Sequence, residues 1–318
     1  MADHDTGWRS AARTPVHRIR PIVESMDVGV LHPGAMGSAL AGAISRPVAW
    51  ASEGRSEDTS RRAQLCGLVD VGSLDSLVDT TDIVISVCPP HAAVDVAVAV
   101  SARGFTGIYV DANAVSPDTV GLIAERFDRF VDGGIIGPPP EEAGSTRLYL
   151  AGPDAPSVAE LWAGSVVDAV VLDGTIGSAS ALKMAFAGWT KGSAALLMAV
   201  RAYAEAAGVS RALVAEWADS IPGLEDKVTR SAERTGPKAW RFAGEMEEIA
   251  QSMEAVGLPS GFHTAAARIY ASLADLKGEI EPSLDEVLEL LTRDASGAST
   301  IDATRTSSRD AGRAGLRG

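Results

Sequence analysis

The segment Val28–Gly37 (VGVLHPGAMG) places an apolar run directly before a glycine-punctuated turn, and a helical pattern follows. The run Met26–Leu31 is short and, apart from Asp27, apolar, as in a buried strand. Met36, Leu40 and Ile44 then recur every four residues, which gives the next segment one apolar helical face. A strand, a tight turn and a helix in this order predict the first unit of an α/β sheet.

The turn itself has the features of an anion-binding loop. Gly34 and Gly37 let the backbone approach a bulky group, and the helix behind them offers unpaired N–H groups and the positive end of its dipole. The pattern predicts a dinucleotide-binding loop, although His32 and Pro33 stand where GxGxxG begins with a glycine. The alternative is a tight turn without a ligand. The predicted contacts are His32, Pro33, Gly34, Ala35, Met36 and Gly37.

Composition narrows the class of protein. The chain has 318 residues, 46% of them apolar, with a mean hydropathy of +0.10, and no stretch approaches the roughly 20 apolar residues that span a bilayer. Its net charge of −14 argues against nucleic acid or an anionic membrane as partner. The N-terminal 25 residues lack the apolar core of a signal peptide, so a cytoplasmic location is expected. Cys66 and Cys88 are too few for a disulfide framework, and no metal site is expected.

The order of the predicted elements indicates two domains. Short β-branched runs bounded by turn residues continue after the first strand: Pro47–Trp50, Asp82–Val87, Gly107–Asp111, Arg129–Asp132, Arg147–Leu150 and Val170–Leu172. Helical patterns then fill the second half: Ser178–Ala207, Ala239–Ala255, Gly261–Leu273 and a helix opened by the capping box Ser283–Glu286. We therefore predict a flexible tail over 1–24, a doubly wound Rossmann-type domain over 25–176, an all-α domain over 177–296 and a tail over 297–318.

The tip of the second strand bears on the choice of dinucleotide. Ser52 and Arg55 offer a hydroxyl and a bidentate fork to a 2′-phosphate, which favours NADP, whereas Glu53 is the sign expected for NAD. A solvated loop position for Arg55 is the alternative. Val87, Cys88 and Pro89, after the Asp82–Val87 strand, complete the predicted cofactor contacts.

Four segments in this order resemble the β-hydroxyacid dehydrogenases, the group of 3-hydroxyisobutyrate dehydrogenase and, more distantly, 6-phosphogluconate dehydrogenase and imine reductases. The loop His32–Gly37 is similar to their GLGxMG, and Asp111–Pro117 to their DxSTxxP. Asp132–Gly137 is similar to DAPVSGG, and Gly177–Lys183 to the GxGxxxK that opens a long interdomain helix. The segments Lys183–Gly192 and Lys238–Glu248 resemble a subgroup with a phosphogluconate-dehydrogenase-like C-terminal domain and no assigned substrate.

The resemblance implies hydride transfer between a nicotinamide cofactor and a hydroxy or oxo acid or a related carbonyl compound. It implies that Lys183 is the proton donor and acceptor, because a lysine that is partly desolvated between domains has a lowered pKa. It also implies a homodimer that uses the long helix, whose small and apolar residues offer surface on several sides.

Departures from the family pattern gather on the substrate side. Ala187 stands where the family has an asparagine, Asn113 and Ala114 replace the serine and threonine, and Ile136 replaces the serine of the VSGG turn. A small hydroxyisobutyrate-like substrate is therefore not favoured. The predicted substrate contacts are Asn113, Ile136, Gly137, Thr190, Lys191 and His263.

Several alternatives stay open at this point. Lys191 faces either the cleft, where it would bind an anionic group remote from the carbonyl, or solvent. A lone histidine such as His263 is more often structural, and Trp189 and Trp240 are expected in the core. Pro138–Pro140 either closes the substrate pocket or forms a rigid surface loop. An imine reductase on the same scaffold and a non-catalytic dinucleotide-binding protein are the other functions, and the retained Lys183 favours carbonyl chemistry over the former.

Overall fold

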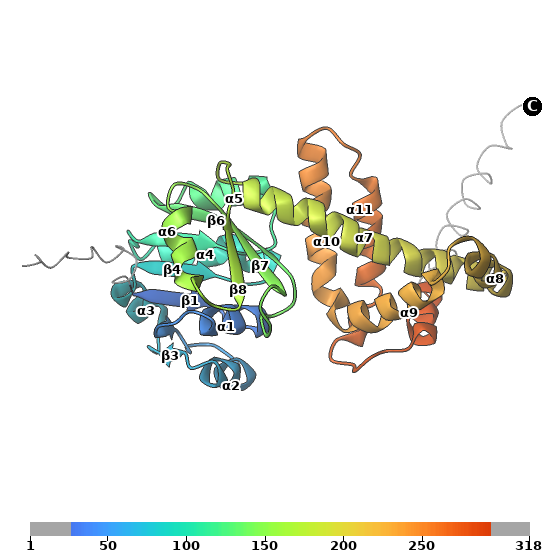
Figure 1. Ribbon diagram of the computed structural model, residues 1–318, viewed down its shortest axis with the longest axis horizontal. Coiled ribbons are helices and arrows are strands. Elements are labelled where there is room, and N and C mark those ends of the chain that lie inside the picture. The colour runs from blue at the N-terminus through green and yellow to red at the C-terminus, as the bar shows by residue number, and fades with distance from the viewer. Residues whose placement is uncertain (1–26, 294–318) are drawn as a thin grey trace, which may run out of the picture.

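The computed structural model describes residues 27–293, so the tails predicted for 1–24 and 297–318 lie outside the described residues. A sheet flanked by helices is followed by a helical region, and one long helix, α7, extends from the first into the second (Figure 1). None of the described helices is long and apolar enough to cross a membrane. The predicted α/β domain followed by an all-α domain is confirmed.

The sheet has eight strands in the order β3-β2-β1-β4-β5-β6-β7-β8. Its strands are β1 Val28–Leu31, β2 Val48–Trp50, β3 Val69–Asp70, β4 Ile83–Ser86, β5 Ile108–Asp111, β6 Phe130–Ile136, β7 Thr146–Ala151 and β8 Val167–Val171. All neighbouring pairs are parallel except β6 and β7. The strand order reverses direction between β1 and β4, which is the switch point where ligands bind in doubly wound sheets.

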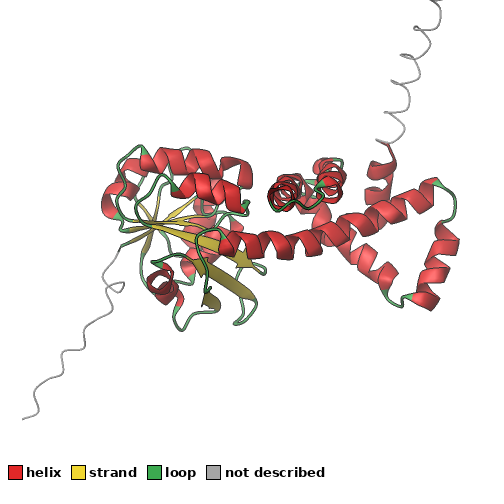
Figure 2. Ribbon diagram, turned by 90° about the horizontal axis from the view of Figure 1, so that it is seen from above, coloured by secondary structure: helices red, strands yellow, loops and turns green. Residues whose placement is uncertain are grey.

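Helices cover both faces of the sheet, as Figure 2 shows. The helices of this half are α1 Ala35–Gly42, α2 Glu57–Leu65, α3 Leu74–Thr80, α4 Ala93–Ser101, α5 Pro117–Ala124 and α6 Ala155–Ala159. Side chains of α1, α2 and α6 share one buried cluster with the sheet, and those of α3, α4 and α5 share the other. Each inner strand is thus apolar on both sides, which explains its uninterrupted run of buried residues.

The helical half is organised around α7. Its helices are α7 Ser178–Ala206, α8 Ser210–Ser220, α9 Leu224–Thr235, α10 Ala239–Ala255 and α11 Gly261–Ala271, and residues 284–293 are also helical. The antiparallel pair α10 and α11 packs across α7 (Figure 1). A third buried cluster joins α7, α10 and α11 through side chains such as Met184, Met246 and Tyr270.

Most predicted elements are confirmed, although several of their bounds differ. The strand predicted over Arg129–Asp132 continues to Ile136, and the two-residue strand β3 was missed because both of its residues are exposed. The helix predicted to end at Leu273 ends at Ala271. Trp189 and Trp240 are 70% and 39% exposed, so the prediction that they lie in the core was wrong. The capping box is confirmed by bonds in both directions between Ser283 and Glu286.

Candidate active site

The predicted dinucleotide loop connects β1 to α1 at the switch point of the sheet. Gly34 is the N-cap of α1 in extended conformation and has no side chain to cap the helix, which leaves the first-turn N–H groups for an external acceptor. A Cβ on Gly37 would lie 3.2 Å from the Cβ of Val87 and 3.3 Å from the carbonyl oxygen of His32, so a side chain there would be crowded. His32 takes a left-handed φ of 55°, and its carbonyl oxygen accepts a hydrogen bond from Gly34 N at 2.6 Å. The loop is therefore a tight turn in which the backbone is exposed to an approaching group.

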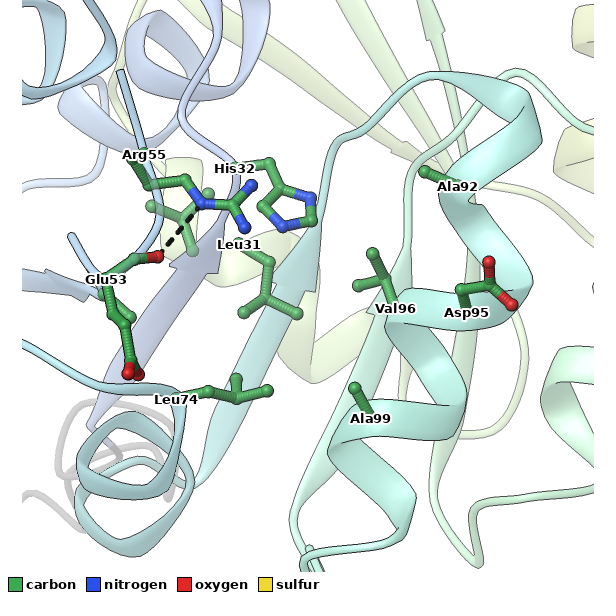
Figure 3. A pocket seen from close by; sticks show the side chains of 11 residues that line it. Leu31, His32, Glu53, Arg55, Leu74, Ala92, Asp95, Val96 and Ala99 are labelled. Atoms are coloured by element: carbon green, nitrogen blue, oxygen red, sulfur yellow. Dashed lines mark hydrogen bonds between the residues drawn. The ribbon is translucent and has the colours of Figure 1, made fainter. Parts of the chain in front are cut away.

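A cavity of about 270 Å³ opens beside this loop. It is lined by Val30, Leu31, His32, Ala51, Glu53, Arg55, Leu74, Ala92, Asp95, Val96 and Ala99. Figure 3 shows His32 and Arg55 next to each other on one side, and the α4 residues Asp95, Val96 and Ala99 opposite. The apolar walls and the single basic corner are the surroundings that an adenine and a ribose phosphate require.

Arg55 has the orientation that the phosphate prediction needs. Its Nε donates to the backbone oxygen of Glu53 at 3.3 Å, and its guanidinium lies beside the imidazole of His32, whereas the Glu53 carboxylate points away (Figure 3). Burial, and then the positive charge of Arg55, lowers the pKa of His32 to about 4, so this imidazole is neutral at pH 7. Ser52 does not line the cavity, and its N–H donates to Asp70 Oδ1 at 3.2 Å.

Asn113 joins the carboxyl ends of β4 and β5. Its Nδ2 donates to Ser86 Oγ at 3.1 Å and to Asp111 Oδ2 at 2.8 Å, and its Oδ1 accepts from Cys88 N at 2.6 Å. The residue is 2% exposed. Both polar atoms of the amide are thus engaged inside the protein, which argues against the predicted direct contact with substrate. Asn113 instead fixes the backbone at Cys88, one of the predicted cofactor contacts.

Asp132 attaches the start of α7 to the sheet. Its Oδ2 accepts from the N–H groups of Gly177, Ala179 and Ser180 at 2.8–3.1 Å, and its Oδ1 accepts from the Ser180 hydroxyl at 2.7 Å. A buried carboxylate therefore satisfies N–H groups that the helix itself leaves open. Gly134 lets the helix lie close to β6, because a Cβ there would be 2.5 Å from the oxygen of Ala179.

Lys183 lies one turn into α7 and above the end of β6. Its Nζ donates to the carbonyl oxygen of Ile135 at 2.7 Å. Burial, and then the positive charge of Arg241, lowers its pKa to about 8. No ion pair with a described carboxylate holds the ammonium in its charged form. Lys183 is therefore a buried amine that exchanges its proton near neutral pH.

Lys191 is buried where α7 meets α10, so of the two positions considered for it the structure excludes the solvent-facing one. It forms an ion pair with Glu245, and its Nζ lies 4.4 Å from the centre of the Phe242 ring. Burial, followed by the charges of Lys183 and Arg241, lowers its pKa well below the ordinary value. Arg241 is exposed, and its Cζ lies 5.5 Å from the same ring.

The other predicted substrate contacts differ in their relation to Lys183. Thr190 is exposed and its hydroxyl donates to the Phe186 oxygen at 3.0 Å, as a helix residue facing solvent does. His263 packs with its Nε2 against Gly188 and Gly192, which face away from Lys183 on the helical wheel. Its Nδ1 is buried and has no hydrogen-bond partner among the described residues. Ile136 is buried at the end of β6, and the exposed Gly137 follows with a φ of 127°, so these two do lie near Lys183.

Glu248 of α10 connects the helical half to the sheet half at α5. Its Oε2 accepts from Ser116 N at 2.6 Å and from Thr119 Oγ1 at 3.1 Å, at the start of α5. Glu248, Asp132 and Arg241 were not predicted as site residues from the sequence. The resembling segments already contained all three, and the spacing of Arg241, Glu245 and Glu248 on one helical face was the available signal.

Sequence comparison finds one domain and one relative. Residues 204–273 match the family described as a domain of unknown function, DUF1932. An uncharacterized 28.5 kDa protein of Methanothermus fervidus is 35% identical over 159 residues, which are 49% of this chain and 61% of that protein. The match thus spans less than two thirds of the relative's length.

Structural comparison finds the same two-part architecture in dehydrogenases. The conserved protein MTH1747, of unknown function and described as similar to 3-hydroxyacid dehydrogenases, is 27% identical with a TM-score of 0.60, over 79% of this chain and 98% of that one. The 3-hydroxyisobutyrate dehydrogenase of Mycobacterium tuberculosis, solved with L-serine, is 15% identical with a TM-score of 0.59 over 84% and 99%. Psf3, solved with NADP⁺ and 2-OPP, is 16% identical with a TM-score of 0.55 over 83% and 99%. The chain therefore shares its fold with proteins described as 3-hydroxyacid dehydrogenases or as similar to them, and residues 204–273 of its helical half match DUF1932.

Proposed function

We propose that this protein is an NADP-dependent oxidoreductase that interconverts an alcohol and a carbonyl group in a hydroxy or oxo acid or a related compound, with Lys183 as general acid and base. The observation that carries the proposal is the buried Lys183 ammonium at the oxygen of Ile135. It lies at the same edge of the sheet as the dinucleotide loop, because β1, β4, β5 and β6 run parallel. The named dehydrogenases with the same fold support the reaction class.

The loop and cavity suit a nicotinamide dinucleotide. Gly37 has no side chain where a pyrophosphate would approach, the open N–H groups of α1 face the same place, and the cavity beside His32 takes the adenosine end. The neutral His32 and the cationic Arg55 favour NADP, since they offer a hydrogen bond and a charge to a 2′-phosphate. When bound, the cofactor supplies or accepts the hydride.

The protein's own residues provide the proton. In carbonyl reduction the Lys183 ammonium donates one proton to the oxygen that becomes the hydroxyl, and the resulting amine regains a proton from water. In alcohol oxidation the neutral amine accepts the hydroxyl proton. Asp132 and Gly134 hold α7 against β6 so that Nζ stays at this point, and Asn113 holds the backbone at Cys88 on the cofactor side.

The assembly proposed with this function is a homodimer formed through α7. Phe186, Trp189, Leu196 and Tyr203 are exposed along one side of this helix, and together they form an apolar strip on the described surface. A strip of large apolar side chains on a long helix is the usual surface for burial against a partner. A second copy of the chain is the partner expected from the long helix.

The experiment that tests the function is NADPH oxidation with a panel of oxo acids and, separately, cyclic imines, by wild type and Lys183→Ala. Loss of general acid catalysis costs about 10²–10⁴-fold in rate, so Lys183→Ala should fall by that factor while still binding NADPH. Unchanged turnover in Lys183→Ala would reject the role of the lysine. Activity on imines alone would replace carbonyl reduction with imine reduction, and NADPH binding without turnover on either panel would indicate a non-catalytic binding protein.

A further inference from the structure

Three cationic side chains lie along the contact between α7 and α10, and among the described residues one carboxylate, that of Glu245, forms an ion pair with any of them. Lys183 and Lys191 come from α7, Arg241 comes from the first turn of α10, and Glu245 pairs with Lys191. Among the described residues, neither Lys183 nor Arg241 forms a salt bridge. The cluster therefore carries excess positive charge in a chain whose net charge is −14. An acidic protein that concentrates unpaired cations beside its predicted reaction centre has the electrostatics of an anion-binding site.

Phe242 holds two of these cations in place. Its ring centre lies 4.4 Å from Lys191 Nζ and 5.5 Å from Arg241 Cζ, so the lysine and the guanidinium share one aromatic side chain. Glu245 of α10 forms an ion pair with Lys191, and the charge of Lys191 is therefore largely neutralised. Arg241 has no such partner and is exposed, which leaves its donors for a ligand.

The arrangement also gives a direction. Lys183 is bound to Ile135 at the end of β6, and Lys191 follows eight residues later, about 12 Å further along the helix axis. Lys183 and Lys191 are eight residues apart and so lie toward one side of α7, and the Phe242 ring that Lys191 and Arg241 both contact places the guanidinium beside Lys191. A molecule whose carbonyl meets Lys183 can therefore extend toward Arg241.

We propose that Arg241, with Lys191 behind it, binds an anionic group of the substrate that lies beyond the reacting carbonyl. This inference rests on the proposed function and specifies its substrate class: a carbonyl compound with a carboxylate or phosphate remote from the reacting carbon. Arg241 is the specificity-determining residue for this group, because a guanidinium binds carboxylate or phosphate with two parallel hydrogen bonds. Glu245 is a positioning residue that keeps Lys191 in the cluster.

The test measures binding without reaction. Oxo acids are titrated calorimetrically into enzyme saturated with NADP⁺, which cannot reduce them. Two matched pairs serve as probes: 2-oxoglutarate with 2-oxopentanoate, and 2-oxoadipate with 2-oxohexanoate, where only the first of each pair has a second carboxylate, at the end remote from the oxo group. Inorganic phosphate is the competitor that distinguishes a phosphate preference from a carboxylate preference.

Wild type should bind at least one of the two dicarboxylates about tenfold more tightly than the matched monocarboxylate. If the site prefers phosphate, inorganic phosphate should instead bind about tenfold more tightly than the monocarboxylates. Arg241→Ala should abolish that difference, Arg241→Lys should restore part of it, and Arg234→Ala, which removes an exposed arginine of α9, should keep it. Circular dichroism checks that each variant is folded. Equal binding of both members of each pair without phosphate binding would overturn the inference, as would an unchanged difference in Arg241→Ala.

This outcome is separate from that of the proposed function. If Lys183→Ala loses turnover but the anion preference is missing, only the present inference fails. If Arg241 determines the preference while no carbonyl compound is reduced, the anion site stands and the oxidoreductase proposal fails.

Discussion

Asp132 and Ser180 are joined by two hydrogen bonds, from the Ser180 hydroxyl to Oδ1 at 2.7 Å and from its N–H to Oδ2 at 3.1 Å. They connect the middle of β6 to the first turn of α7, although 48 residues separate the two in the chain. The whole helical half continues from this joint, because α7 is the element that leaves the sheet and enters the helical cluster. The joint therefore fixes where Lys183 stands.

Asp132→Asn should destabilise the protein, because an amide offers one oxygen where the carboxylate uses two. At least one N–H or hydroxyl would lose its acceptor inside the protein, at a cost of about 1–3 kcal/mol. Thermal unfolding measures the effect, with an expected fall of about 2–4 °C per kcal/mol for a chain of this size. The matched control is Asp168→Asn, the same substitution at an exposed position of β8. Equal melting temperatures for the two variants would contradict the anchoring role of Asp132.

The rate of the proposed reaction should depend on pH in opposite ways in its two directions. With a pKa of about 8, Lys183 is mostly protonated below that pH and mostly neutral above it. Carbonyl reduction needs the ammonium, so its rate should fall as the pH rises through about 8, and alcohol oxidation needs the amine, so its rate should rise over the same interval. Rates at saturating cofactor from pH 6 to pH 10 measure both profiles. Parallel profiles in the two directions would argue against Lys183 as the titrating group.

Arg55→Ala should reduce the preference for NADPH over NADH. The guanidinium contacts the extra phosphate in the proposed complex, and a charge-assisted hydrogen bond of about 1.5–3 kcal/mol corresponds to roughly 10–100-fold in KM for NADPH. KM for NADH should change little, since NADH has an uncharged 2′-hydroxyl in place of the phosphate. Arg61→Ala, which removes an exposed arginine of α2, is the control. A wild-type preference for NADH would sink the assignment of NADP.

Trp189→Asp and Leu196→Asp should convert the proposed dimer into monomers, because a carboxylate would have to be buried without a partner. The two side chains are 70% and 48% exposed on one side of α7. Light scattering at micromolar concentration gives the mass directly. Leu65→Asp is the control, since Leu65 is 80% exposed on α2 in the sheet domain. A monomeric wild type, or variants that remain dimeric, would refute the α7 interface.

The sequence predicted those parts of the molecule whose interactions are local. The strand, turn and helix of Val28–Gly37, the start of α7 at Ser178 and the capping box at Ser283 all depend on residues within a few positions of one another. Lys183 was predicted through its place in the Gly177–Lys183 segment, which also sets its distance from the helix start. Periodicity and turn residues carry that information without reference to the tertiary structure.

What the sequence did not predict depends on distant partners. Asp132 meets Ser180 48 positions away, Glu248 meets Ser116 132 positions away, and no local pattern indicates such pairs. Asn113 was assigned to the substrate because its neighbours were unknown, and its amide turned out to be engaged by Ser86, Asp111 and Cys88. Trp189 was placed in the core on hydrophobicity alone, which cannot distinguish an interior face from an exposed one on a helix with apolar residues on several sides.

β6 and β7 form the one antiparallel pair of the described sheet. Since β7 and β8 run opposite to the other strands, their carboxyl ends lie at the far edge, away from the Lys183 contact. The connection 137–145, which starts two residues after Ile135, joins β6 to β7 at the near edge, where β8 also begins. Its length and its Pro138–Pro140 run can therefore diverge without disturbing either the cofactor loop or the helical anchor, and a library restricted to these nine positions is the economical place to search for new substrates.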